Sequence, residues 1–211
     1  MSSIPSQIIS DVDRRNSEKK TAVIAAATHI FLEQGFHNSS MDAIARAAGV
    51  SKQTIYNNFG SKESLFSAIA SERCLDMLSA LLKSEQADAN TEATLHAFAK
   101  TLLHILLEPA ALALHRLIIA ESARFPEVGE IYHRAGPERG NQLLAKYLDH
   151  QSKLHHLDVQ NTALAAQQFT GALIGSVRTR ALVLNKTISP AEQRRIVDYT
   201  VKCFMRMHGT S

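Results

Sequence analysis

The chain has 211 residues, of which 45% are hydrophobic and 20% charged, and its net charge is +3 at neutral pH. This length and apolar content suffice for one or two packed cores, which excludes a disordered chain. The first twenty residues lack the apolar core of a signal peptide, and no apolar run reaches the ~20 residues that span a bilayer. We therefore expect a cytoplasmic protein with no membrane contact.

Helical patterns account for most of the chain, and no alternating pattern bounded by hairpin residues predicts a strand. Residues 1–16 are polar and contain Pro5, so we predict a mobile arm there. The first helix is expected from Ser17 to Gln34, and Gly35 ends it as a C-terminal glycine. The sequence thus predicts an all-α fold.

A second, shorter helix follows. It is expected to begin at Ser39 or Ser40, because Ser39 and Asp42 have the spacing of a capping box. Gly49 then provides a turn, since glycine adopts positive φ without steric cost.

Ser51 caps a third helix that ends near Asn58, and Ser61 caps a fourth that is expected to reach about Lys83. Two domains are predicted, an N-terminal three-helix domain at residues 17–62 and a C-terminal helical bundle at residues 63–211. The later helices are expected at residues 91–107, 110–124, 127–135, 137–152, 159–184 and 190–207. Four prolines lie at or near starts of these helices, namely Pro109, Pro126, Pro137 and Pro190.

The second and third helices, joined by a tight turn, form a helix-turn-helix, whose second helix enters the major groove of DNA. Residues 14–62 contain seven basic and three acidic side chains, and this excess of +4 is larger than the net charge of the whole chain. Such a local excess is typical of a polyanion partner. A solvated basic face, or a helix-turn-helix used for protein contacts, would have the same pattern. We predict that double-stranded DNA is contacted by Ser40, Ser51, Lys52, Gln53, Thr54, Tyr56, Asn57, Asn58 and Lys62.

Residues 25–66, "AAATHIFLEQGFHNSSMDAIARAAGVSKQTIYNNFGSKESLF", resemble the TetR family of bacterial transcriptional regulators. The resemblance implies a homodimeric regulator, in most cases a repressor, whose C-terminal domain binds a small-molecule effector. It also implies that Tyr56 and Lys62 contact phosphates, while Lys52, Gln53, Thr54 and Asn57 lie toward bases. Residues 115–148 resemble, more faintly, the effector domain of AefR-like regulators.

Two late helices are candidates for a dimer interface. Gly171 and Gly175 lie four residues apart on one helical face, so another helix can approach closely there. The last helix has two apolar faces, one of them with Ile196, Tyr199 or Thr200, Cys203 and Met207. The other face carries Val197, Val201 and Phe204, which we assign to the interface together with the two glycines. The alternative is a monomer with a wider core.

An effector pocket is expected among the helices between residues 91 and 176. Its polar candidates lie in largely apolar helices, where such groups either pair with one another or meet a ligand. Glu121 and Arg124 are expected to form an ion pair at i,i+3 spacing. The predicted lining is Leu102, His104, Leu106, His115, Ile118, Ile119, Ser122, Phe125, Tyr147 and Phe169.

Neither a metal site nor a catalytic centre is predicted. Cys74 and Cys203 are far apart and no paired Cys/His spacing occurs, so each is expected to be a small buried residue in a reducing compartment. No P-loop, dinucleotide fingerprint or nucleophile elbow is present. We therefore expect no cofactor and no enzymatic activity, although an enzyme built on helices is the remaining alternative.

Overall fold

The computed structural model describes residues 6–71 and 90–210, and for residues 6–16 it describes the backbone only. Within these ranges the regular secondary structure is helical, with an isolated bridge between Leu157 and Gly209. The predicted all-α class is confirmed. The described residues form two compact units. Unit 1 comprises the described residues within Met1–Ile69 and Leu117–Tyr132. Unit 2 comprises those within Ala70–Arg116 and His133–Ser211.

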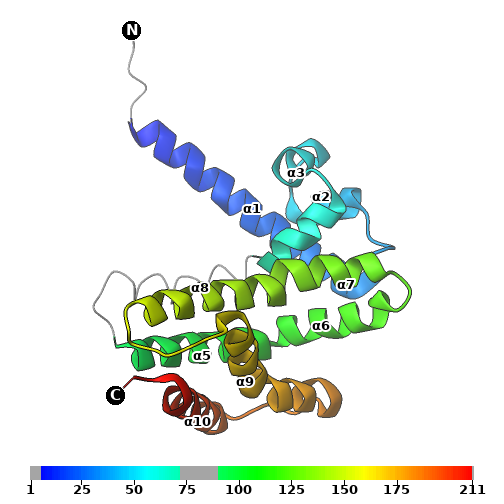
Figure 1. Ribbon diagram of the computed structural model, residues 1–211. Helices are drawn as coiled ribbons and strands as arrows, with labels where there is room; N and C mark the ends of the chain where they lie inside the picture. The colour runs from blue at the N-terminus through cyan, green and yellow to red at the C-terminus, as the bar shows by residue number, and fades with distance from the viewer. Residues whose placement is uncertain (1–5, 72–89, 211) are drawn as a thin grey trace. The chain divides into compact units, whose positions relative to one another are not determined.

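Unit 1 begins with α1 (Ser6–Gln34), followed by α2 (Met41–Ala48) and α3 (Lys52–Phe59). Helix α2 packs on both α1 and α3 (Figure 1). A further helix starts at residue 62 and is described as far as residue 71. Its predicted end near Lys83, and Cys74, lie outside the described residues.

Helix α1 differs from the prediction at its start. Residues 6–16, which were expected to form a mobile arm, are helical. This segment contains neither glycine nor proline, so nothing in it interrupts the helix that follows. Polarity alone was therefore a poor guide to where the helix begins.

The core of unit 1 is built around three phenylalanine rings. The centroid of Phe31 lies 5.4 Å from that of Phe36 and 5.6 Å from that of Phe66, and Phe36 and Phe66 are 5.1 Å apart. Ile44 of α2 and Ile55 of α3 are fully buried. The short helices are therefore anchored by a few large apolar side chains.

Unit 1 also extends beyond the predicted domain boundary at residue 62. It includes the end of α6 (Pro109–Ser122) and most of α7 (Pro126–His133), which were assigned to the second domain. Ile118 of α6 and Val128 of α7 are buried.

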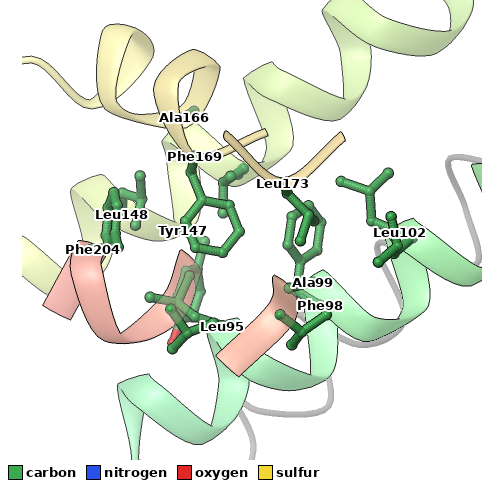
Figure 2. Packing of buried hydrophobic residues seen from close by; sticks show 14 of the residues in the cluster. Leu95, Phe98, Ala99, Leu102, Tyr147, Leu148, Ala166, Phe169, Leu173 and Phe204 are labelled. Carbon is green, nitrogen blue, oxygen red and sulfur yellow. The ribbon is translucent and has the colours of Figure 1, made fainter. Parts of the chain in front are cut away.

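Unit 2 contains α5 (Thr91–Leu107), α8 (Arg139–Lys153), α9 (Thr162–Leu184) and α10 (Pro190–His208). Their apolar faces meet in one core, where Phe98, Tyr147, Phe169 and Phe204 lie close together (Figure 2). The rings of Phe169 and Phe204 meet edge to face, with centroids 5.2 Å apart. These four helices begin and end within three residues of the predicted limits.

Pro137 occupies an unexpected position. It lies inside a π-helical turn, η1 (Arg134–Glu138), that joins α7 to α8, and not near the start of a separate helix. Proline has no N–H and therefore interrupts the regular bonding of an α-helix, and the π-helical turn lies at this interruption. Helical structure therefore continues through the proline.

No single described helix is both long and apolar enough to cross a membrane. Helices α5 and α6 meet the criteria of length and composition only when they are taken together, and a bend of 66° separates them.

Candidate nucleic-acid interface

The helix-turn-helix is formed by α2 and α3, and each helix has a serine cap. The Ser40 hydroxyl accepts a hydrogen bond from the Ala43 N–H at 3.1 Å, and Ser51 accepts one from the Thr54 N–H at 3.1 Å. Gly49 ends α2 in the left-handed conformation, with φ of 65°. The turn therefore has the predicted chemistry, with Ser40 as the cap of α2.

Ser39, the other candidate for that cap, is buried. Its hydroxyl donates to the Phe36 carbonyl at 2.6 Å, so it stabilises the chain between α1 and α2. The capping box that was expected between Ser39 and Asp42 does not form, because the helix begins one residue later.

Helix α3 exposes four polar side chains on one face, Lys52, Gln53, Tyr56 and Asn57. Helical residues three or four positions apart share a face, so this set can reach one partner together. The Gln53 side-chain nitrogen donates to the Asn57 side-chain oxygen at 2.8 Å, which aligns the two amides. Lys52 Nζ lies 2.9 Å from the Asp42 carboxylate, and this hydrogen bond raises the pKa of Lys52.

Two other predicted DNA contacts bond within the helix. The Asn58 side-chain nitrogen donates to the Thr54 carbonyl at 2.7 Å, and the Thr54 hydroxyl lies 2.8 Å from the Ser51 hydroxyl. Both interactions are local to α3 and its cap.

The Lys62 ammonium group contacts the chain between α1 and α2. Its Nζ lies 2.8 Å from the Phe36 carbonyl, 3.2 Å from that of His37 and 3.0 Å from that of Ser39. A lysine has three N–H donors, so these three carbonyls satisfy all of them. Burial lowers the pKa of Lys62, while Glu63 and Glu121 act in the opposite direction. The expected contact between Lys62 and a phosphate stays a prediction.

Sequence reasoning missed the residues that contact the chain between α1 and α2 from α6 and α7. Glu121, expected to pair with Arg124, accepts a hydrogen bond from the Phe36 N–H at 3.2 Å. The His37 ring stacks on Phe125, and its Nε2 lies 3.2 Å from the Glu127 carboxylate. Partners about 85 to 90 residues apart leave no periodic signal in a sequence.

The predicted effector-lining residues fall into both units. Leu102, Tyr147 and Phe169 belong to the buried core of unit 2, and Leu106 packs against it. His104 is exposed, while the half-buried His115 has its pKa lowered by burial and by nearby Arg178. The other predicted lining residues belong to unit 1, and they are Ile118, Ile119, Ser122 and Phe125.

Unit 2 also has surface hollows. One of about 570 Å³ is lined in part by His133, Asn141, Lys146 and Gln167 of the helices α7 to α9. None of the predicted effector-lining residues borders this hollow, or either of two further hollows along α10.

Some of the predicted dimer residues are exposed and the others are buried. Gly171 and Gly175 are exposed on α9, and an added β-carbon at either would meet no atom within 4 Å. Val197, Val201 and Phe204 are buried in the core of unit 2, with at most 6% of their surface exposed. The assignment of those three to an interface is wrong, because this apolar face of α10 packs within its own chain.

The described residues contain no group of three or more His, Cys, Asp or Glu side chains arranged to hold a metal ion. Cys203, on α10, is partly buried.

The capped α2 and α3, with a polar face on a short helix that buried side chains anchor, have the geometry of a helix-turn-helix. Residues 23–69 match the family model of bacterial regulatory proteins of the tetR family, and residues 93–210 match that of the AefR-like transcriptional repressor C-terminal domain. The chain belongs to the TetR family of transcriptional regulators and carries an AefR-like C-terminal domain.

Solved structures of relatives cover nearly the whole chain. One, from Mesorhizobium loti MAFF303099, is assigned to the TetR family and is 30% identical, with a TM-score of 0.77 over 93% of this chain and 99% of that one. The flavonoid-responsive regulator FrrA is also 30% identical, with a TM-score of 0.67 over 92% and 98% of the two chains.

Among curated proteins, the regulator UidR of Escherichia coli K12 is 46% identical over 50 residues. That match covers 24% of this chain and about a quarter (26%) of UidR. The similarity to UidR is therefore confined to a short segment of either protein.

Proposed function

We propose that this protein binds a pseudopalindromic DNA operator as a homodimer and represses transcription until a small hydrophobic effector releases it. The observation that carries the proposal is the exposed polar face of α3. Lys52, Gln53 and Asn57 would face base edges, where glutamine and asparagine amides pair with adenine and lysine pairs with guanine. Tyr56, which is 41% exposed, would contact the phosphate backbone.

The homodimer would use α9 and α10. Gly171 and Gly175 are exposed on α9, and an added β-carbon at either would meet no atom, so a second helix could approach closely there. On α10 the large exposed apolar residues are Tyr199 and Met207, and they replace the buried set predicted from sequence. Two copies of this face would form an isologous interface of four helices.

Repression and release rest on the relatives. The C-terminal domain resembles that of AefR-like transcriptional repressors, and FrrA responds to flavonoids. An effector bound in unit 2 would favour a dimer whose recognition helices no longer match successive major grooves, so the affinity for DNA would fall. Such a regulator acts in the cytoplasm, where bacterial DNA is found.

The test is selection of duplexes from a random-sequence library by the purified full chain, followed by fluorescence anisotropy over a salt series. We expect a pseudopalindrome with half-sites about 10 base pairs apart, and affinity that falls steeply as salt rises. A panel of flavonoids should then release the enriched duplex. Failure to enrich any duplex would contradict the proposal and favour a helix-turn-helix used for protein contacts.

Neighbouring asparagines provide a matched pair of variants. Asn57→Ala should weaken binding to the enriched duplex by roughly 5- to 100-fold and relax the preference at one base position. Asn58→Ala should change affinity much less, because the Asn58 amide already bonds to the Thr54 carbonyl. Equal losses for the two variants would show that α3 does not read bases through this face.

A further inference from the structure

The chain between α1 and α2 is held by two oppositely charged side chains. The Lys62 ammonium contacts the carbonyls of Phe36, His37 and Ser39 at 2.8 to 3.2 Å. The Glu121 carboxylate accepts from the Phe36 N–H at 3.2 Å. Phe36 therefore has its N–H bonded to an anion and its carbonyl bonded to a cation.

The Glu121 carboxylate can reach the Phe36 N–H because Gly35, the residue before Phe36, has no side chain. Gly35 has φ of 79°, and a β-carbon at this residue would collide with Oε1 of Glu121. A second contact holds the same part of the chain, since the rings of His37 and Phe125 stack with centroids 3.3 Å apart. Glu121 and Phe125 both lie within unit 1, so these contacts belong to one compact body.

The held segment leads directly into the helix-turn-helix. Ser39 follows it and is buried, Ser40 caps α2, and α2 packs against α3. A shift of the Phe36 peptide would therefore move the start of α2, and with it the helix that carries the polar face. The side chain that holds Phe36 by its N–H lies 85 residues away, on α6.

We infer that Glu121 is a positioning residue for DNA binding, which sets the orientation of α2 and α3 by holding the Phe36 peptide against Lys62. The inference rests on the proposed function and deepens it, because it places part of the DNA-binding apparatus on α6. Glu121 contributes through hydrogen-bond geometry and not through attraction to DNA, since a carboxylate repels phosphates.

Positioning and electrostatic repulsion predict opposite changes in DNA affinity when Glu121 is removed. Removing a negative charge should, by electrostatics alone, leave affinity for DNA unchanged or raise it. Loss of positioning should lower it. We expect Glu121→Ala to weaken binding of the library-selected duplex roughly tenfold, about the worth of one charge-assisted hydrogen bond. Glu121→Gln should recover most of the affinity, because the amide oxygen can accept the same N–H.

Glu130→Ala is the matched control, since Glu130 is an exposed glutamate on α7. It removes the same charge and should bind DNA as well as the unaltered chain or slightly better. Affinities are compared at equal concentrations of folded protein, determined by far-ultraviolet circular dichroism. Equal affinity of Glu121→Ala and Glu130→Ala would overturn the inference, and so would a failure of Glu121→Gln to exceed Glu121→Ala.

Amide hydrogen exchange tests, without DNA, whether Glu121 holds the Phe36 N–H. In the full chain, Glu121→Ala should accelerate exchange at Phe36 while the amides of the unit 2 core keep their protection. Unchanged exchange at Phe36 would overturn the inference even if the DNA measurements agreed with it. If the unaltered chain selects no duplex, the proposed function fails, and exchange at Phe36 alone then decides whether Glu121 holds this peptide.

Discussion

At the scale of single residues, Gly35 and Gly49 look alike in sequence but differ in what surrounds them. Both end a helix with positive φ, 79° and 65° respectively. A β-carbon at Gly49 would meet no atom within 4 Å, whereas one at Gly35 would displace the Glu121 carboxylate. The two positions therefore separate backbone strain from the loss of a tertiary contact.

We predict that Gly49→Ala lowers the free energy of unfolding by about 1 kcal/mol, the cost of a left-handed conformation for alanine. Gly35→Ala should cost about 1 kcal/mol more, because it also breaks the hydrogen bond between Glu121 and Phe36. Urea unfolding followed by circular dichroism measures both. Equal losses would mean that the carboxylate moves aside without cost.

At the scale of helices, the positive charge at the C-terminus of α9 comes from an arginine of another helix. The last turn of α9 contains no basic residue, and Asn185 ends this helix with φ of 50°. The Arg116 guanidinium of α6 donates to the carbonyls of Ala181 at 2.9 Å and Leu182 at 3.3 Å. A cation at the C-terminus of a helix is stabilised by the helix dipole and by unpaired carbonyls.

Arg116→Ala should therefore lower the free energy of unfolding by about 1–2 kcal/mol, since it leaves those carbonyls without a charged donor. Arg139→Ala is the control, because Arg139 is an exposed arginine at the start of α8, and it should change stability by less than about 0.5 kcal/mol. Thermal and urea denaturation of the two variants provide the comparison. A loss for Arg116→Ala no larger than that of the control would refute the capping role.

At the scale of the whole molecule, the proposed dimer depends on the exposed face of α9 and α10. Tyr199 and Met207 are 71% and 69% exposed in the single chain, so α10 presents two large apolar side chains that a partner could cover. An aspartate at position 199 would place a charge in the centre of the proposed interface, where burial of an unpaired charge is costly.

We predict that Tyr199→Asp weakens self-association roughly 30-fold or more, which sedimentation velocity can measure, and weakens operator binding with it. Leu154→Asp is the control, because Leu154 is an exposed apolar residue (48%) at the end of α8 and outside this face. Its self-association should match that of the unaltered chain. Dimers of undiminished affinity in Tyr199→Asp would place the interface elsewhere.

Local chemistry in the sequence determined the all-α class, most helix limits, and the cap and turn of the helix-turn-helix. Ser51 and Gly49 act through neighbours within four residues, so the pattern around them is sufficient. The polar face of α3 was predictable for the same reason. The start of α1 and the π-helical turn at Pro137 were not, because polarity and a single proline are weak signals in a helical context.

Only the tertiary structure decided which surfaces meet. An amphipathic helix shows that it has an apolar face but not what covers it, so Val197, Val201 and Phe204 could be assigned to a dimer when they fill the core of unit 2. The sequence did not show that the Lys62 ammonium group contacts the carbonyls of the chain before α2. Glu121 and Phe36 are 85 residues apart, and contacts at such separation depend on how the whole chain packs.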